Sequence, residues 1–79
     1  MTIKTLYQKI NNLINAAEEL HDDMEEKRDE IEAKADDKGR DMTDREQERY
    51  DALDNAADHL TDCANYLTDA LNELEEIDL

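Results

Sequence analysis

The spacing of apolar residues constrains this chain more than any other feature of its sequence. In the first half, apolar or near-apolar residues recur at alternating steps of three and four, with one lapse at Lys27. They are Ile3, Leu6, Ile10, Leu13, Ala17, Leu20, Met24 and Ile31. The second half continues the alternation at Tyr50, Leu53, Ala57, Leu60, Ala64, Leu67, Leu71 and Leu74. Such alternation places residues on one face of a helix and is typical of a coiled-coil seam. An all-α fold is therefore predicted, since no segment alternates with the period of a strand.

The segment between the two seams carries the signals that end one helix and begin another. Gly39 is the only glycine in the sequence, and glycine readily adopts the left-handed conformation that follows a helix. Thr43 and Glu46 match the Thr-x-x-Glu capping box, and Thr2 is a candidate N-cap at the start of the chain. We predict one domain over residues 1–79, with a helix over 3–36, a loop over 37–43 and a helix over 44–77.

Two helices of equal length joined by a short loop are expected to fold back as an antiparallel, coiled-coil-like hairpin. Facing residues in such a hairpin have numbers with a constant sum. The two seams pair with sums of 80 or 81, as in Leu6 with Leu74 and Ile10 with Leu71. The same register predicts two interhelical ion pairs, Arg28 with Asp54 and Glu30 with Arg49.

A second stripe on the predicted second helix suggests a further contact surface. Its members are spaced by three, four or seven residues and are Ala52, Ala56, His59, Cys63, Tyr66, Ala70 and Ile77. Small residues let another helix approach closely, so we expect a homodimer that forms a four-helix bundle. A lesser stripe on the first helix, at Tyr7, Ile14 and His21, would serve the same end. Alanine as a mere helix former, or a stripe that meets a different protein, are the alternatives.

Residues that carry chemistry are few. His21 and His59 fall at one level of the hairpin, and Cys63 lies one turn beyond His59. A zinc site is disfavoured because the seam directs the two histidines to different flanks and a closed site needs four ligands. Cys63 sits among acidic residues, which disfavour a thiolate nucleophile. We therefore expect no enzyme activity, no metal site and no cofactor.

The charge of the chain limits its partners. The sequence holds 24 acidic and 9 basic residues, for a net charge of −15. Nucleic acids and anionic membranes are disfavoured as direct partners, because both require a basic surface. No apolar run is long enough for a membrane span, and no signal-peptide pattern opens the chain. One cysteine allows no internal disulfide, which suits a reducing compartment, so a cytoplasmic location is expected.

Carboxylates form rows on both predicted helices. The ladder on the second helix consists of Asp51, Asp54, Asp58, Asp62, Asp69, Glu73 and Glu76. The first helix carries Asp22, Asp23, Glu25, Glu26, Asp29, Glu30 and Glu32. Steps of three to four residues separate carboxylates by roughly 5–6 Å along the axis, near the spacing of phosphates in a nucleic-acid strand. One interpretation is a surface that competes with nucleic acid for a basic groove. The others are a solubilising surface and a divalent-ion buffer.

The chain resembles the small, acidic, all-helical proteins of bacteriophages and other mobile elements. The resemblance rests on composition and helical rhythm in three segments, residues 42–50, 51–57 and 71–76. Some such proteins are nucleic-acid mimics that block restriction or CRISPR nucleases. The resemblance implies a non-enzymatic inhibitor in a bacterial host, bound to a basic nucleic-acid-binding protein. The alternatives are a structural or adaptor bundle, and a small-ligand sponge within a larger oligomer that uses Tyr7, Lys9 and Tyr66.

Overall fold

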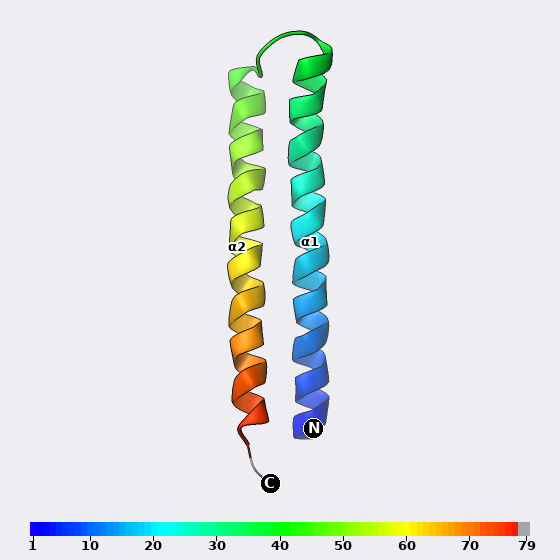
Figure 1. Cartoon of the computed structure of the whole chain (residues 1–79), viewed down its shortest axis with the longest axis vertical. Helices are drawn as coiled ribbons and strands as arrows, with labels where there is room; N and C mark the ends of the chain where they lie inside the picture. The colour runs from blue at the N-terminus through cyan, green and yellow to red at the C-terminus, as the bar shows by residue number, and fades with distance from the viewer. Residues whose placement is uncertain (78–79) are drawn as a thin grey trace.

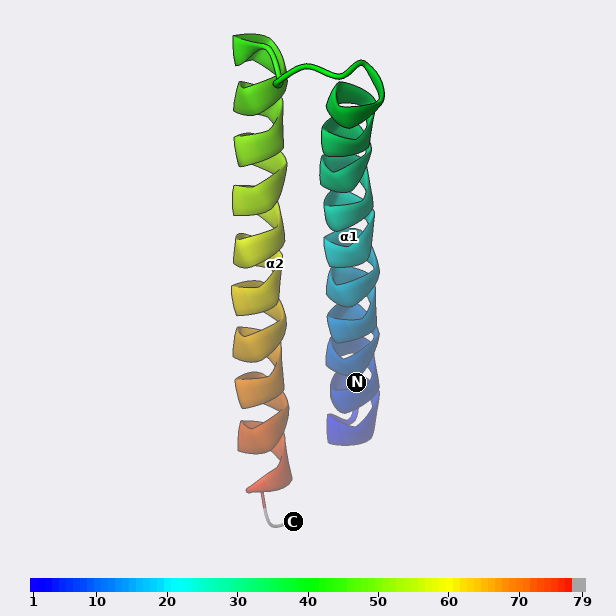
Figure 2. The same ribbon diagram turned by 45° about the horizontal axis from the view of Figure 1, so that its top comes forward.

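The computed structural model describes residues 1–77, which form two antiparallel helices joined by a short loop (Figure 1). Helix α1 spans Ile3–Asp37 and helix α2 spans Asp44–Glu75, and this part of the chain contains no strand. The pair forms a rod with extents of 62 × 15 × 14 Å. A view turned by 45° shows the helices still side by side along their length (Figure 2). The predicted all-α hairpin is thus confirmed.

Side-chain and backbone caps define both ends of α1. The Thr2 hydroxyl accepts a hydrogen bond from the Thr5 N–H at 3.1 Å, as the N-cap prediction requires. At the other end Gly39 has a φ of +65°, and its N–H donates to the Asp36 carbonyl at 3.0 Å. The Arg40 N–H then donates to the Ala35 carbonyl at 3.2 Å. Glycine reaches this conformation without the steric cost of a Cβ, so α1 ends one residue later than predicted, just before the turn.

A complete capping box begins α2. The Thr43 hydroxyl accepts from the Glu46 N–H at 3.1 Å, and the Glu46 carboxylate accepts from the Thr43 N–H at 3.2 Å. Arg40 binds the same carboxylate at 2.9 Å, and these contacts, the one with Arg40 foremost, lower the pKa of Glu46.

Helix α2 ends at Glu75, two residues before the predicted end at 77. Its last turn carries no basic residue, and carboxylates at a helix C-terminus oppose the helix dipole. The N–H groups of Glu76 and Ile77 bond three residues back, to the carbonyls of Glu73 and Leu74. This tighter turn closes the helix.

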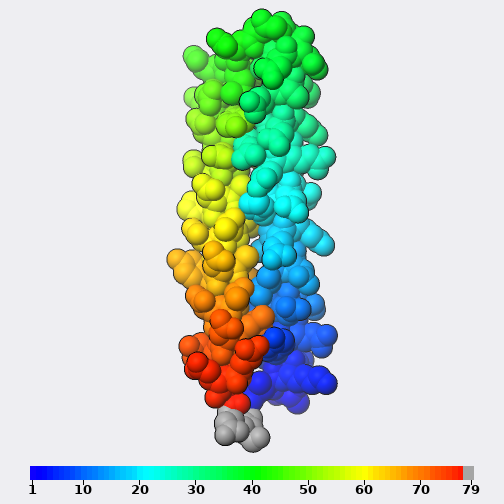
Figure 3. Space-filling model, viewed as in Figure 1, coloured from blue at the N-terminus to red at the C-terminus, as the bar shows by residue number. Residues whose placement is uncertain are grey.

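The core between the helices is thin. Only four residues in 1–77 are buried, namely Ala17, Ala35, Ala57 and Leu71, and no large side chain there is fully buried. The space-filling view shows the same narrow rod, with the two helices in contact along one line (Figure 3). Each helix covers the other on one side only, so most seam residues are only half-buried.

The prediction for the seam of α1 is partly wrong. The periodicity predicts Leu6, Leu13 and Leu20 in this seam, yet they are 37%, 55% and 46% exposed. Ile14 and His21, each one residue further along, are half-buried in their place. Ile10 and Ala17 lie at the centre of the contact, with Leu13 on one side of them along the helix surface and Ile14 on the other. A small rotation of α1 therefore decides which of these two sides faces α2.

Hydrogen bonds between the helices show which rotation the hairpin adopts. The Tyr7 hydroxyl donates to Glu75 at 3.1 Å, and Arg28 donates to Asp54 at 2.8 Å. The residue numbers of both pairs add up to 82, so the two hydrogen bonds lie on the same flank of the hairpin and hold that flank of α1 against α2. The predicted Arg28–Asp54 pair is confirmed. The predicted pair between Glu30 and Arg49 is absent from the ion pairs of residues 1–77.

Candidate functional site

The flank that carries the interhelical hydrogen bonds is strongly acidic towards the loop. At about 100° per residue, the positions that accompany Arg28 and Asp54 on this side follow from their spacing along each helix. We call this surface the acidic face, and it consists of Glu18, Asp22, Glu25, Asp29 and Glu32 on α1, with Asp51, Asp54 and Asp58 on α2. Most of these side chains are exposed, and only Glu25 and Asp54 are half-buried.

Arg28 is the base that holds the middle of the acidic face together. Its guanidinium lies 2.8 Å from Asp54, 3.2 Å from Asp29 and 4.0 Å from Glu25. It also lies 5.9 Å from the centre of the Tyr50 ring, within the range of a cation–π contact. The hydrogen bond to Asp54, followed by the one to Asp29, raises the pKa of Arg28. Asp54 therefore stabilises the contact between the two helices and is also part of the predicted ladder.

His21 occupies the same side of the hairpin, one heptad before Arg28. Its Nε2 lies 2.9 Å from Glu25 and its Nδ1 lies 3.3 Å from Asp22. A shallow groove passes this histidine between the helices and is lined by Glu18, His21, Asp22, Leu60, Thr61, Ala64 and Asn65. The groove is open to solvent, so its carboxylates are accessible to a partner.

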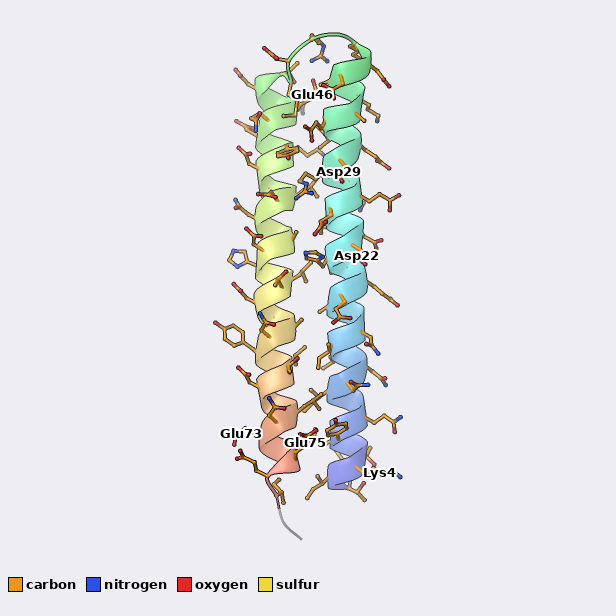
Figure 4. All side chains as sticks on the ribbon, viewed as in Figure 1. Lys4, Asp22, Asp29, Glu46, Glu73 and Glu75 are labelled. Carbon is orange, nitrogen blue, oxygen red and sulfur yellow. The ribbon has the colours of Figure 1, made fainter. Side chains whose placement is uncertain are left out.

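The predicted ladder on α2 is divided between several directions. Asp51, Asp54 and Asp58 belong to the acidic face, and Asp51 accepts a hydrogen bond from Gln47 at 3.0 Å. Asp62, Asp69 and Glu76 project from the side of α2 that faces away from α1. Figure 4 shows Glu73 on the outer side of α2, whereas Glu75 lies towards α1.

Both helices therefore contribute carboxylates to the acidic face. Sequence reasoning treated the two carboxylate rows separately, because a row read along one helix carries no information about its neighbours across the seam. The predicted Arg28–Asp54 pair is the one sequence signal that the two rows lie together. It places the middle of the carboxylate row on α1 beside the start of the ladder on α2.

The opposite flank of the hairpin is apolar over the half nearer the termini. The rotation of α1 leaves Leu6, Leu13 and Leu20 on this flank. Four members of the predicted stripe on α2 lie on the same side, one heptad apart. The resulting leucine face consists of Leu6, Leu13, Leu20, Ala56, Cys63, Ala70 and Ile77. Its seven residues include no charged side chain. The remaining stripe members, Ala52, His59 and Tyr66, lie further round α2, and Tyr66 is 73% exposed.

The residues considered for metal binding or nucleophilic chemistry are not assembled into one site. His59 and the free Cys63 are exposed on α2, whereas His21 lies on the opposite flank, against Glu25. Among residues 1–77 no group of three histidine, cysteine, aspartate or glutamate side chains is placed to hold a metal ion. Within that same range no helix has the length and apolar character needed to cross a membrane.

Comparison of the chain with protein-family models, with curated protein sequences and with solved structures gives no significant match. The two faces of the hairpin are therefore the basis on which a function is proposed.

Proposed function

We propose that the chain is a non-enzymatic protein-binding module that docks its acidic face on a basic groove of a nucleic-acid-binding protein and excludes nucleic acid from it. The supporting observation is the concentration of charge on this face, where eight carboxylates surround the single base Arg28. Rows on α1 and α2 present these carboxylates on a surface that the interhelical contacts keep in one arrangement.

The physical logic is that of electrostatic complementarity. A basic groove that normally binds phosphates attracts any ordered array of anions of similar spacing. The net charge of −15 steers the chain to such a groove from a distance. Exposed carboxylates that are already held on rigid helices lose little conformational freedom when they bind.

The test begins with DNA-binding proteins of the host retained on immobilised double-stranded DNA and eluted with the purified chain. A protein released in this way is then purified, and labelled DNA is used to measure competition. Two variants provide the decisive comparison. The face variant combines Glu32→Gln, Asp51→Asn and Asp58→Asn, and the control combines Glu26→Gln, Asp62→Asn and Asp69→Asn.

Both variants change the net charge from −15 to −12 with the same substitutions, and they differ only in position. We expect the face variant to compete at least about tenfold less well than the wild type, with added salt weakening competition further. The control should compete within about twofold of the wild type. Equal losses in the two variants would show that total charge matters and the acidic face does not.

A further inference from the structure

The leucine face lacks a cover within the hairpin, and the rod exposes more surface than a compact monomer of its mass. The chain has an accessible surface of 6109 Å² for a mass of 9.2 kDa. A compact monomer of that mass exposes about 4900 Å², so the hairpin exposes roughly 1200 Å² more. Each partner in a stable protein complex contributes about 800 Å² to the interface. The excess surface of the whole rod is thus larger than the area that one partner of a stable complex buries.

We propose that the leucine face binds the leucine face of a second copy about a two-fold axis parallel to the helices. This inference is independent of the acidic face, which remains exposed on the opposite flank. It assigns the contact to both helices, because the exposed leucines of α1 face the small residues of α2.

The chemistry of the face favours a second copy over a charged partner. A chain with a net charge of −15 repels its own copies unless the contact avoids the acids. The seven residues of the leucine face carry no charge, and residues 1–20, which supply its leucines, contain two bases and two acids.

The orientation of the axis makes the register of the dimer predictable. Rotation about an axis parallel to the helices leaves every residue at its own height and places α1 of one copy against α2 of the other. Residues that meet must therefore keep the sum of about 82 that joins Tyr7 to Glu75 and Arg28 to Asp54 within the hairpin. At the centre of the face, pairs whose residue numbers add up to 83 place each leucine against a smaller or equal residue. These pairs are Leu6 with Ile77, Leu13 with Ala70, and Leu20 with Cys63. Ala56 meets Lys27 in the same register, so the apolar contact ends at this level of the rod.

The outer rim of the face is complementary in the same register. Next to the leucines lie Lys9, Ala16 and Asp23 on α1, and next to the small residues of α2 lie Glu73, Tyr66 and His59. Pairs whose residue numbers add up to 82 join Lys9 to Glu73, Ala16 to Tyr66 and Asp23 to His59 of the second copy. The exposed Tyr66 ring thereby gains a small neighbour, and opposite charges meet at the end of the rod near the termini.

An axis perpendicular to the helices gives a poorer match. It would pair α1 with α1 in antiparallel fashion, and full overlap requires sums near 40. Leu6 would then face Lys34 and Leu13 would face Lys27 of the second copy. Burying leucines against lysines removes the apolar gain, so the parallel axis is favoured.

The first experiment measures mass by analytical ultracentrifugation over a range of concentrations. The wild type should have twice the mass of one chain, and Leu13→Glu should weaken dimerisation at least about 100-fold. Asn12→Glu adds the same charge at nearly the same height on the solvent side of α1, and it should leave the dimer intact. A wild type that stays monomeric up to about 200 µM, or equal behaviour of the two variants, would overturn the proposal.

A charge exchange at the rim tests the register without touching the apolar face. In homodimers of Lys9→Glu or of Glu73→Lys, both rim contacts become repulsive, and dimerisation should weaken at least about tenfold. A mixture of the two variants forms a heterodimer in which both contacts are again attractive, so it should dimerise within about threefold of the wild type. A mixture no tighter than the two variants alone would refute the register. Both residues are exposed, and circular dichroism of each variant verifies that the helices persist.

Cross-linking distinguishes the two axes. In a Cys63→Ala background, Ala16→Cys with Tyr66→Cys should give a covalent dimer with a short bis-maleimide. A cross-link between Leu6→Cys and Lys34→Cys in the same background should be absent from the digested product, because the parallel axis keeps these two positions 28 residues apart along the helix. The reverse result would establish antiparallel α1–α1 packing in place of the proposed axis.

Discussion

Leu71 should make the largest single contribution to the stability of the hairpin among its seam residues. It is the only large side chain among the buried residues of the part of the chain that the structure describes, with 7% of its surface exposed. Leu71→Ala removes three carbons from the seam, worth about 2 kcal/mol at roughly 0.8 kcal/mol per methylene. A cavity adds to this, although two helices with solvent on both flanks can close around it. We expect the free energy of unfolding to fall by about 2–3 kcal/mol, at the low end for such substitutions.

The assay is thermal and urea unfolding followed by circular dichroism at fixed protein concentration. A loss of 2–3 kcal/mol corresponds to a decrease in Tm of about 10–20 °C for a chain of this size. Asn72→Ala, at the neighbouring exposed position, is the control and should change stability by less than about 0.5 kcal/mol. Leu71 faces Ile10 in the antiparallel register, since their residue numbers add up to 81. A double-mutant cycle of these two residues should therefore give an interaction energy of at least about 0.5 kcal/mol. Unfolding of Leu71→Ala within 2 °C of the wild type would contradict both the burial and the register.

Three further predictions concern the helix ends. Thr43→Ala should lower the free energy of unfolding by about 1 kcal/mol in urea denaturation, because it removes the hydroxyl that accepts from Glu46. Gly39→Ala should cost about 1–2 kcal/mol because φ is +65°, although a Cβ there would meet no atom within 4 Å; an unchanged urea midpoint would contradict the strain. The lowered pKa of Glu46 means that its contribution is complete above its usual value of 4.5 and is lost as the pH falls through the lower value in the folded state. Unfolding of Glu46→Gln should therefore depend less on pH below 4.5 than that of the wild type, as thermal melts from pH 3 to pH 6 would show.

Local signals in the sequence were sufficient for the elements and their ends. Thr2, Gly39 and the Thr43–Glu46 box each act through bonds to backbone groups within a few residues, so their effects can be read from the chain itself. The C-terminus of α2 was predicted two residues too late, because apolar periodicity continues to Ile77 while the carboxylates of the last turn oppose the helix dipole.

The candidate surfaces were harder to predict, because they depend on how α1 is rotated. Leu13 and Ile14 are both large and apolar, and either fits the seam by periodicity alone. The choice depends on groups that are distant in sequence, since Arg28 reaches Asp54 and Tyr7 reaches Glu75 only when the flank that carries Ile14 and His21 turns inward. The pKa of Tyr7 is raised chiefly by its hydrogen bond to Glu75, which is a further sign of that contact.

The sequence by itself determined two helices, their caps and an antiparallel register, because periodicity and capping act locally and the loop length leaves one way to fold back. Only the tertiary structure decided which residues each flank presents. A small rotation of α1 exposes Leu6, Leu13 and Leu20 beside the small residues of α2, and it joins two separate rows of carboxylates into the acidic face. The physical reason is that the helix places neighbouring positions about 100° apart, so contacts between the helices assign every residue to a face at once.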